Sequence, residues 1–310
     1  MKIVVTGGAG YIGSVLVPLL LSEGHSVTVV DNFVYNQSSL LDCCFDKRLT
    51  IIRGDARDER LMAELVPQAD AILPLACLTG APICAREPET AAAVNRDAVR
   101  MIAERMSRDQ MIVFPCTNSG YGIGQDDIFC DERTPLKPIS LYGRLKVEIE
   151  SYLLDGGNAV TFRFATLFGI SPRMRLDLLV NDFTYRAVAD RFIVLFEPHF
   201  KRNYLHVRDA ARAFSHALTN YDRMKGRAFN VGLSDANLSK WELCEVIREY
   251  VPEFYFTAAE VGKDPDQRNY VVSNRRIEAT GFKPAVGLGA GIEELIKGYQ
   301  IIRRNQFSNV

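Results

Sequence analysis

A tyrosine and a lysine one helical turn apart are the first residues whose types could do chemistry together. In the segment LYGRLK, Tyr142 and Lys146 are four residues apart, so a helix places both side chains on one face. A free tyrosine has a pKa near ~10 and is a poor base at neutral pH, but a neighbouring ammonium group favours the phenolate. The pair is a candidate base, although such pairs also occur by chance on amphipathic helices.

A glycine-rich segment supplies the second chemical signal. VVTGGAGYIG places Gly8, Gly10 and Gly13 in GxGxxG spacing between a predicted strand and a predicted helix, and Gly7 also allows a GxxGxxG interpretation. Such glycines let the backbone approach a pyrophosphate, whose charge interacts with the free N–H groups of the helix N-terminus. The alternative is a glycine-rich turn that binds nothing.

Two acidic residues follow the next two predicted strands. Asp31 ends the second strand 21 residues after Gly10, where a carboxylate can bond ribose hydroxyls. It would repel a 2′-phosphate, and Asn32 and Phe33 supply no compensating arginine, so the pattern predicts NAD and not NADP. Asp55, in RGDARD, lies where a loop can reach the adenine edge, and a solvated turn aspartate is an almost equal alternative.

An alternation of strands and helices must position these residues. Helices are expected over 11–23, 87–105 and 140–154, and the predicted strands cover 2–6, 26–30, 49–53, 71–77, 110–116 and 159–164. This alternation predicts an α/β fold, a Rossmann-type doubly wound parallel sheet with helices on both faces.

The regularity loosens after Gly169, which predicts a smaller C-terminal lobe with helices over 207–220, 239–250 and about 290–303. We expect an NAD-binding domain over 1–168, with contributions from about 203–232, and a mainly substrate-binding lobe over 169–310. The sequence has no internal repeat or linker, so the two lobes are expected to share one interface.

Composition excludes several other classes of function. The chain has 310 residues with 37 basic and 38 acidic side chains, a net charge of −1, which gives no reason to expect nucleic acid or a membrane as partner. Seven cysteines without a CxxC pair and four histidines without ligand spacing predict reduced thiols and no metal site. The sequence shows no signal sequence and no membrane-spanning apolar run, so we expect a cytoplasmic protein.

Together these motifs resemble the extended short-chain dehydrogenase/reductase superfamily, the sugar-nucleotide epimerases and dehydratases. The resemblance rests on the glycine segment, Asp31, Tyr142 with Lys146, and a polar turn before Tyr121. It covers nearly the whole chain, continuing through TFRFATLFGISPR, LLVNDF, RNYLHVRDAA and FNVG.

The resemblance implies a mechanism and a set of contacts to NAD. Thr117, at the end of the fifth strand, would hydrogen-bond the reacting sugar hydroxyl, and Tyr142 would remove its proton as hydride leaves the same carbon for NAD. Lys146 would also hold the nicotinamide ribose. The other expected cofactor contacts are Gly7, Gly10, Tyr11, Ile12, Gly13, Asp31, Asn32, Asp55, Ala56, Leu75 and Ala76.

The two residues after Thr117 distinguish reaction types within this family. Its 4,6-dehydratases carry Asp and Glu there, an acid and a base for eliminating water, whereas this chain has Asn118 and Ser119. Neither side chain titrates near neutral pH. The sequence therefore predicts hydride chemistry without loss of water.

The expected substrate is a nucleotide diphosphate sugar, whose diphosphate needs local donors in a neutral protein. By resemblance Arg202, Asn181 and Arg268 contact this group, and guanidinium groups suit diphosphates. Arg173 and Arg175, in SPRMR, stay open between phosphate contacts and exposed charges. The remaining expected substrate contacts are Thr79, Asn118 and Ser119.

The resulting hypothesis is an NAD-dependent enzyme that oxidises a ring carbon, C4, of a nucleotide-activated sugar, as a dehydrogenase or an epimerase. The segments SPRMRLDLLVNDFTYRA and CTNSGYGIG most resemble bacterial enzymes that oxidise C4 of GDP-heptoses for surface polysaccharide. One alternative is a UDP- or dTDP-sugar 4-epimerase or 4-ketoreductase. Another is a non-catalytic NAD(H)-binding redox sensor, although such sensors typically lose the Tyr and Lys.

The resemblance also implies a homodimer, in which helices near 87–105 and 140–154 pair into a four-helix interface. Both helices offer apolar side chains for it, namely Ala91, Val94, Ala98, Val147 and Ile149. The alternative is a monomer that covers the same side chains internally.

Overall fold

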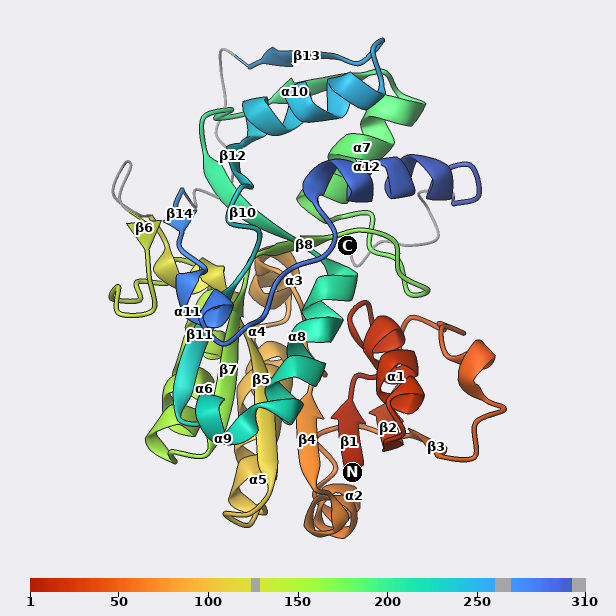
Figure 1. The fold of residues 1–310 in the computed structure, drawn as a ribbon, viewed down its shortest axis with the longest axis vertical. Coiled ribbons are helices and arrows are strands. Elements are labelled where there is room, and N and C mark those ends of the chain that lie inside the picture. The colour runs from red at the N-terminus through yellow and green to blue at the C-terminus, as the bar shows by residue number, and fades with distance from the viewer. Residues whose placement is uncertain (124–128, 260–268, 303–310) are drawn as a thin grey trace.

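A computed structural model describes residues 1–123, 129–259 and 269–302 (Figure 1). A central sheet of seven parallel strands runs in the order β11-β7-β5-β4-β1-β2-β3. The strands are β1 (Lys2–Thr6), β2 (Ser26–Asp31), β3 (Leu49–Arg53), β4 (Ala71–Pro74), β5 (Met111–Thr117), β7 (Ala159–Phe164) and β11 (Arg227–Val231). The order reverses between β1 and β4, and ligands of such sheets bind at this crevice, beyond the carboxyl ends of the strands. The predicted α/β fold is confirmed.

Helices cover both faces of this sheet. Successive side chains of a strand point to opposite faces, and in these strands the side chains on both faces are mostly apolar. In β1, Ile3 and Val5 belong to the core cluster beneath α1 (Gly13–Ser22) and α8 (Val207–Thr219). Val4 faces the other way, toward Met62 of α2. The helices on that second face are α2 (Glu59–Leu65), α5 (Ala98–Glu104) and α6 (Leu141–Asp155).

The C-terminal part of the chain builds a second cluster of elements above the carboxyl ends of the sheet (Figure 1). Its core contains Phe168, Tyr204 and Leu243, all buried. The helices there are α7 (Leu179–Ala189), α10 (Lys240–Tyr250) and α12 (Leu288–Gly298), and the strands are β8 (Thr166–Phe168), β10 (Lys201–His206), β12 (Asn237–Ser239), β9 (Phe192–Leu195) and β13 (Tyr255–Ala258). Two-residue strands β6 (Phe129–Cys130) and β14 (Val271–Val272) pair beside it, next to the short α11 (Arg275–Glu278). The domain division stays a proposal, and β11 and α8 do pack on the first half of the chain.

Four predicted elements differ from the observed ones by two residues or more. The terminal helix, expected over about 290–303, is α12, which covers Leu288–Gly298. The fourth strand ends at Pro74 instead of residue 77, and the residues after it turn into the site described below. The helix expected over 87–105 is divided into α4 (Pro88–Ala92), a π-helical turn (Ala93–Asp97) and α5. The first helix begins at Gly13, two residues later than expected, because Tyr11 and Ile12 belong to the glycine turn.

The side chains expected at a dimer interface lie mostly inside the chain. Ala91, Ala98 and Ile149 are buried, and Val94 lines the cavity described below, so they offer no continuous exposed stripe. The homodimer stays a prediction. Among the described residues, the helices are too short or too polar for any of them to span a bilayer.

Candidate active site

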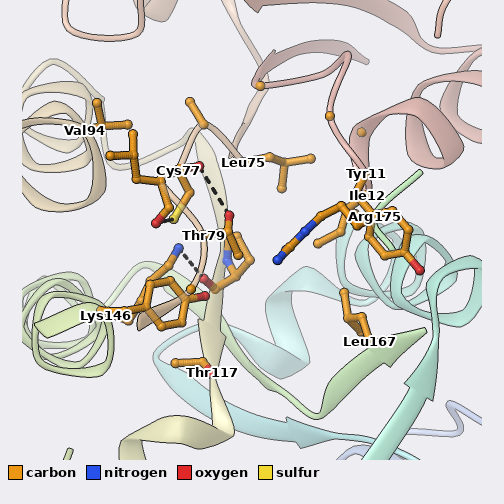
Figure 2. A pocket seen from close by; sticks show the side chains of 18 of the residues that line it. Tyr11, Ile12, Leu75, Cys77, Thr79, Val94, Thr117, Lys146, Leu167 and Arg175 are labelled. Atoms are coloured by element: carbon orange, nitrogen blue, oxygen red, sulfur yellow. Dashed lines mark hydrogen bonds between the residues drawn. The ribbon is translucent and has the colours of Figure 1, made fainter. Parts of the chain in front are cut away.

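A cavity of ≈ 330 Å³ lies at the carboxyl ends of β1, β2, β4 and β5, beneath the C-terminal elements. Its volume is within the range of small-molecule sites, roughly 300–1,000 Å³. The lining brings together the glycine turn, Asp31, Thr117, Tyr142 and Lys146, which are far apart in sequence. Figure 2 shows Tyr11 and Ile12 on one side of this space, and Thr117 and Lys146 on the other.

The glycine turn has the close backbone packing that its sequence predicts. Gly7 has φ +69°, and an added Cβ would lie 2.6 Å from the backbone nitrogen of Ala76, so only glycine fits there. Helix α1 then begins without a side-chain cap, and the cavity lining includes Gly10, Tyr11, Ile12 and Gly13 at this end. An uncapped helix N-terminus directs unbonded N–H groups at an anion. This cradle fits a pyrophosphate.

Asp31 is held at the next strand end in a fixed orientation. One carboxylate oxygen accepts from the Ala9 N–H at 3.0 Å, and the other accepts from the Phe33 N–H at 2.8 Å and from Gln37 Nε2 at 3.2 Å. The side chain is largely buried but lines the cavity. It can therefore accept hydrogen bonds from a diol, as the sequence predicts.

The remaining cofactor residues of the prediction also line the cavity, namely Asn32, Asp55, Ala56, Leu75 and Ala76. Asp55 is less available than expected because Arg57 forms a double hydrogen bond with its carboxylate, at 2.9 and 2.7 Å. This pairing lowers the pKa of Asp55. Asn32 Oδ1 accepts from the Val34 N–H at 3.1 Å, which fixes the loop after β2.

Thr117 ends β5, and a short 3₁₀ turn (Asn118–Tyr121) follows it directly. The Thr117 hydroxyl caps this turn by accepting from the Ser119 N–H at 3.1 Å, and it donates to Ser119 Oγ at 2.9 Å. Thr117 and Ser119 line the cavity, but Asn118 does not, and its buried amide has no hydrogen-bond partner among the residues that the structure describes. The small polar side chains therefore both end the strand and bring two hydroxyls to the site.

Tyr142 and Lys146 enter the cavity from the first turns of α6, which Ser140 caps by accepting from the Gly143 N–H at 3.1 Å. Lys146 is 3% exposed, and its ammonium donates to the Pro115 carbonyl at 2.8 Å (Figure 2) and lies 4.5 Å from the Phe114 ring centroid. These contacts fix the lysine against β5, one helical turn from Tyr142.

Burial raises the pKa of Tyr142 well above its usual value, because a phenolate loses its hydration in this site. The thiols of Cys77, Cys116 and Cys84 act in the same direction, and the guanidinium of Arg175 acts against them. The tyrosine is thus a neutral phenol in the cavity at neutral pH and needs nearby positive charge to serve as a base.

Two of the three residues predicted to contact the diphosphate, Asn181 and Arg202, are described by the structure, and neither lines the cavity. Asn181 is fully buried, and its amide is used internally: Gly169 N–H donates to Oδ1 at 2.9 Å, while Nδ2 donates to the Arg175 carbonyl at 2.8 Å. Arg202 is 3% exposed and does not line the cavity, although its guanidinium carbon lies 5.6 Å from the ring centroid of Tyr270, which does. Arg268 lies outside the described residues. The Asn181 amide thus holds Gly169 and Arg175 in place, and the three expected diphosphate contacts stay predictions.

The two arginines that the sequence left open are both buried and line the cavity. The guanidinium of Arg173 stacks over Tyr35, with its carbon 4.3 Å from the ring centroid, and Arg175 pairs with Asp177. Thr79 lines the cavity as expected, and its hydroxyl donates to the Cys77 carbonyl at 3.3 Å (Figure 2). Lining residues that the sequence did not predict include Tyr35, Gln37, Cys77, Leu167, Leu178 and Tyr270.

Comparison with known proteins agrees with this geometry. Residues 3–232 match the model of the NAD dependent epimerase/dehydratase family. The chain belongs to this family. Its members are NAD-dependent enzymes, and the predicted cofactor is therefore confirmed as NAD. The name of the family also covers two reaction types, epimerisation and dehydration, so it leaves the reaction of this chain open.

Curated relatives and solved structures extend the match over almost the whole chain. The dTDP-glucose 4,6-dehydratase of Streptomyces niveus is 26% identical over 97% of this chain and 93% of its own. The CDP-paratose 2-epimerase of Salmonella typhi is also 26% identical, over 95% of this chain and 98% of its own. The crystal structure of the Thermus thermophilus UDP-glucose 4-epimerase complex with NAD has a TM-score of 0.82 at 24% identity, covering 97% and 99% of the two chains. That last similarity shows the shared fold.

Proposed function

We propose that this enzyme oxidises C4 of a nucleotide diphosphate sugar without eliminating water, as an epimerase or a dehydrogenase. One observation carries the proposal. Thr117, Tyr142 and Lys146 share one cavity with the glycine cradle and Asp31, whereas Asn118 and Ser119 occupy the positions where a 4,6-dehydratase needs an acid and a base.

The residues of the cavity suit NAD in a definite orientation. The cradle at α1 would hold the pyrophosphate, Asp31 would bond the adenosine ribose, and Lys146 would bond the nicotinamide ribose. NAD supplies the hydride acceptor when it is bound. The protein supplies orientation, exclusion of water and a place for the proton.

Proton removal falls to Tyr142, with Thr117 orienting the reacting hydroxyl. As the phenolate, the Tyr142 oxygen accepts the proton of the sugar hydroxyl while the hydrogen on the same carbon leaves as hydride. The Thr117 hydroxyl already has a defined direction because Ser119 bonds it on two sides. These groups perform an alcohol oxidation at one carbon.

Elimination of water would require a further acid and a further base beside the new ketone. The hydroxyl of Ser119 is engaged with Thr117, and Asn118 is a buried amide, which neither gives nor takes a proton near neutral pH. The relative from Streptomyces niveus, named as a dehydratase, thus differs from this chain in the proposed reaction.

The base of the nucleotide and the sugar form the finer part of this proposal. The relatives named above carry dTDP, CDP or UDP in their names, so they give no support to the GDP-heptose expectation. The motifs SPRMRLDLLVNDFTYRA and CTNSGYGIG remain its basis. We therefore keep a GDP-heptose and UDP- or dTDP-hexoses as the candidates for a direct test.

The test begins with mass spectrometry of the nucleotides that copurify with the protein, which identifies the base. The enzyme is then incubated with NAD and GDP-heptose, GDP-mannose, UDP-glucose or dTDP-glucose, with the Y142F variant as matched control. A product of equal mass, or one lighter by two hydrogens with NADH formed, supports the proposal. A product lighter by one water contradicts it.

A non-catalytic sensor makes a different prediction in the same experiment. It would bind NAD and turn over neither the panel nor the copurified nucleotide sugar. The presence of Thr117, Tyr142 and Lys146 on one cavity wall argues against this alternative, since a sensor has no use for a proton acceptor.

A further inference from the structure

Arg175 reaches the cavity from a loop that the mechanism above does not use. This loop, residues 169–178, joins β8 to α7 and forms the side of the cavity across from α6. Figure 2 shows the guanidinium of Arg175 extending into the space between Leu75 and Leu167, opposite Lys146 and Thr117. A buried cation that points into a cavity is costly unless it has a partner or a task.

The position of Arg175 is fixed from two directions. Asp177 accepts from its Nε at 3.2 Å and from its Nη2 at 2.5 Å, a double hydrogen bond that leaves Nη1 for the cavity. The carbonyl of Arg175 accepts from Asn181 Nδ2, and the same nitrogen donates to the Tyr11 hydroxyl at 3.3 Å. The loop is thereby tied to the glycine turn, and Arg175 has little freedom to leave the site.

The groups around Tyr142 show what such a cation would do there. On its own helix lies Lys146, whose ammonium is bonded to the Pro115 carbonyl. The thiols of Cys77 and Cys84, after β4, and that of Cys116, on β5, act to raise the pKa of Tyr142. Arg175 lines the same cavity from across this space, and its guanidinium charge acts to lower the pKa of Tyr142.

We propose that Arg175 is a positioning residue of the reaction, a permanent cation that stabilises the phenolate form of Tyr142 from across the cavity. This inference rests on the proposed function of Tyr142 as the base. A guanidinium suits the role because it stays protonated throughout the working pH range. Asp177 holds it in place and accounts for the cost of burying it.

The proton steps balance without any change in Arg175. The Tyr142 hydroxyl loses its proton to solvent, which gives the phenolate, and Arg175 and Lys146 remain charged. The phenolate would then accept the proton of the sugar hydroxyl, and NAD, when bound, would accept the hydride released from the same carbon. Arg175 thus favours the first step and takes no part in the transfer itself.

The test measures ionisation of Tyr142 directly, without substrate. Protein with carbon-13 at tyrosine Cζ is titrated by NMR, and the Y142F variant assigns the Tyr142 resonance among the 12 tyrosines. In R175Q the midpoint should move to higher pH, whereas R175K should remain near wild type. R173Q is the matched control, because Arg173 is the other buried arginine of the loop and stacks on Tyr35; it should leave the midpoint unchanged.

The pH dependence of turnover gives a second readout. On the acid side of the profile, kcat/KM of R175Q should fall on the order of tenfold below wild type, and it should recover as pH rises, since one pH unit is a factor of ten in the phenolate fraction. A raised KM with an unmoved profile would mean that Arg175 only binds substrate, which overturns the inference.

An unmoved Tyr142 midpoint in R175Q also overturns it, whatever happens to activity. Should R175Q fail to fold, D177N keeps the arginine and removes the carboxylate that partly offsets its charge. The titration midpoint of Tyr142 should then move to lower pH in D177N. A midpoint that stays unchanged or moves to higher pH contradicts the inference. Because the NMR titration needs no substrate, its result is separate from failure to find turnover with any nucleotide sugar.

Discussion

The two walls of the cavity are fixed by different means. The cofactor wall consists of strand ends and the glycine turn, which backbone hydrogen bonds of the sheet hold in place. The second wall is the loop 169–178, which side chains tie to the first wall: Tyr11 Oη donates to the Gly169 carbonyl at 2.7 Å, and Ser14 and Ser171 hydroxyls lie 2.9 Å apart. The first wall follows from local sequence, whereas the second depends on contacts about 160 residues apart.

This difference suggests that a substitution in one wall should change a different property from a substitution in the other. Changes in the cofactor wall should affect NAD binding or the proton step and leave the fold stable, because the sheet persists. Changes in the loop wall should cost stability as well, since its polar contacts are buried and shared.

The largest effect is expected at Tyr142. Replacement by phenylalanine removes the ionisable oxygen and keeps the ring, so turnover should fall on the order of 10²–10⁴-fold while NAD binding stays nearly intact. Lys146→Ala should damage both, because it removes a buried charge fixed to β5. Steady-state kinetics and calorimetric NAD titration check this. Near-normal rates for Y142F would show that the base lies elsewhere.

The next effect is expected at Asp31. Asp31→Ala should weaken NAD binding on the order of tenfold, because a hydrogen bond to a charged group contributes about 1.5–3 kcal/mol. Binding of NADP should change much less, because the substitution also removes the repulsion between the Asp31 carboxylate and the 2′-phosphate of NADP. Parallel titrations with the two cofactors measure the ratio. Equal losses for both would mean that Asp31 serves only to hold the Ala9 N–H.

Local patterns made most of the first wall predictable. Three motifs can each be recognised from a few neighbouring residues: the GxGxxG spacing, Asp31 at a strand end, and the Tyr142–Lys146 pair. Residues of all three line the cavity. Asp55 also lines the cavity, but its pairing with Arg57 depends on the conformation of one turn, which the sequence does not show. Functional residues that follow parallel strands can be predicted to share a site, because the sheet brings the carboxyl ends of those strands together.

The contacts of the loop wall could not be predicted, because they join residues that are far apart in the sequence. The helices predicted after Gly169 do not include the segment containing Asn181, although Val180, Phe183, Thr184 and Ala187 are buried at helical spacing in α7. No local pattern showed that the Asn181 amide would bond Gly169 and Arg175 instead of a diphosphate. Whether Arg175 was buried depended likewise on the tertiary contacts of its loop.

Asn181→Ala therefore separates the observed role from the expected one. It leaves the Gly169 N–H and the Arg175 carbonyl unpaired inside the protein, so the free energy of unfolding should fall by about 1–3 kcal/mol. Denaturant titration measures this fall, and NAD titration should change little. A variant of normal stability with only a raised substrate KM would restore the diphosphate contact that the sequence predicted.

The smallest effect concerns Glu294 of α12, at the outer side of the loop wall. Gly169 has φ +106°, and an added Cβ there would lie 2.2 Å from His206 Nε2, so the loop begins against this histidine. Glu294 contacts His206 Nε2 at 3.5 Å and Arg208 Nη1 at 2.6 Å. Partial burial alone would raise the pKa of Glu294, but these two groups lower it to about 2.

A carboxyl whose pKa is lowered on folding stabilises the protein above its unfolded pKa, here 4.5, and this contribution is lost as pH falls toward about 2. The melting temperature of wild type should exceed that of Glu294→Gln at neutral pH, and the gap should close over this interval. The gap should be small, since the side chain is 25% exposed and solvent screens the pair. Glu293→Gln, an exposed neighbour on the same helix, is the control and should show no such gap. A gap that persists at pH 2 would mean that Glu294 supports the loop wall by packing and not by charge.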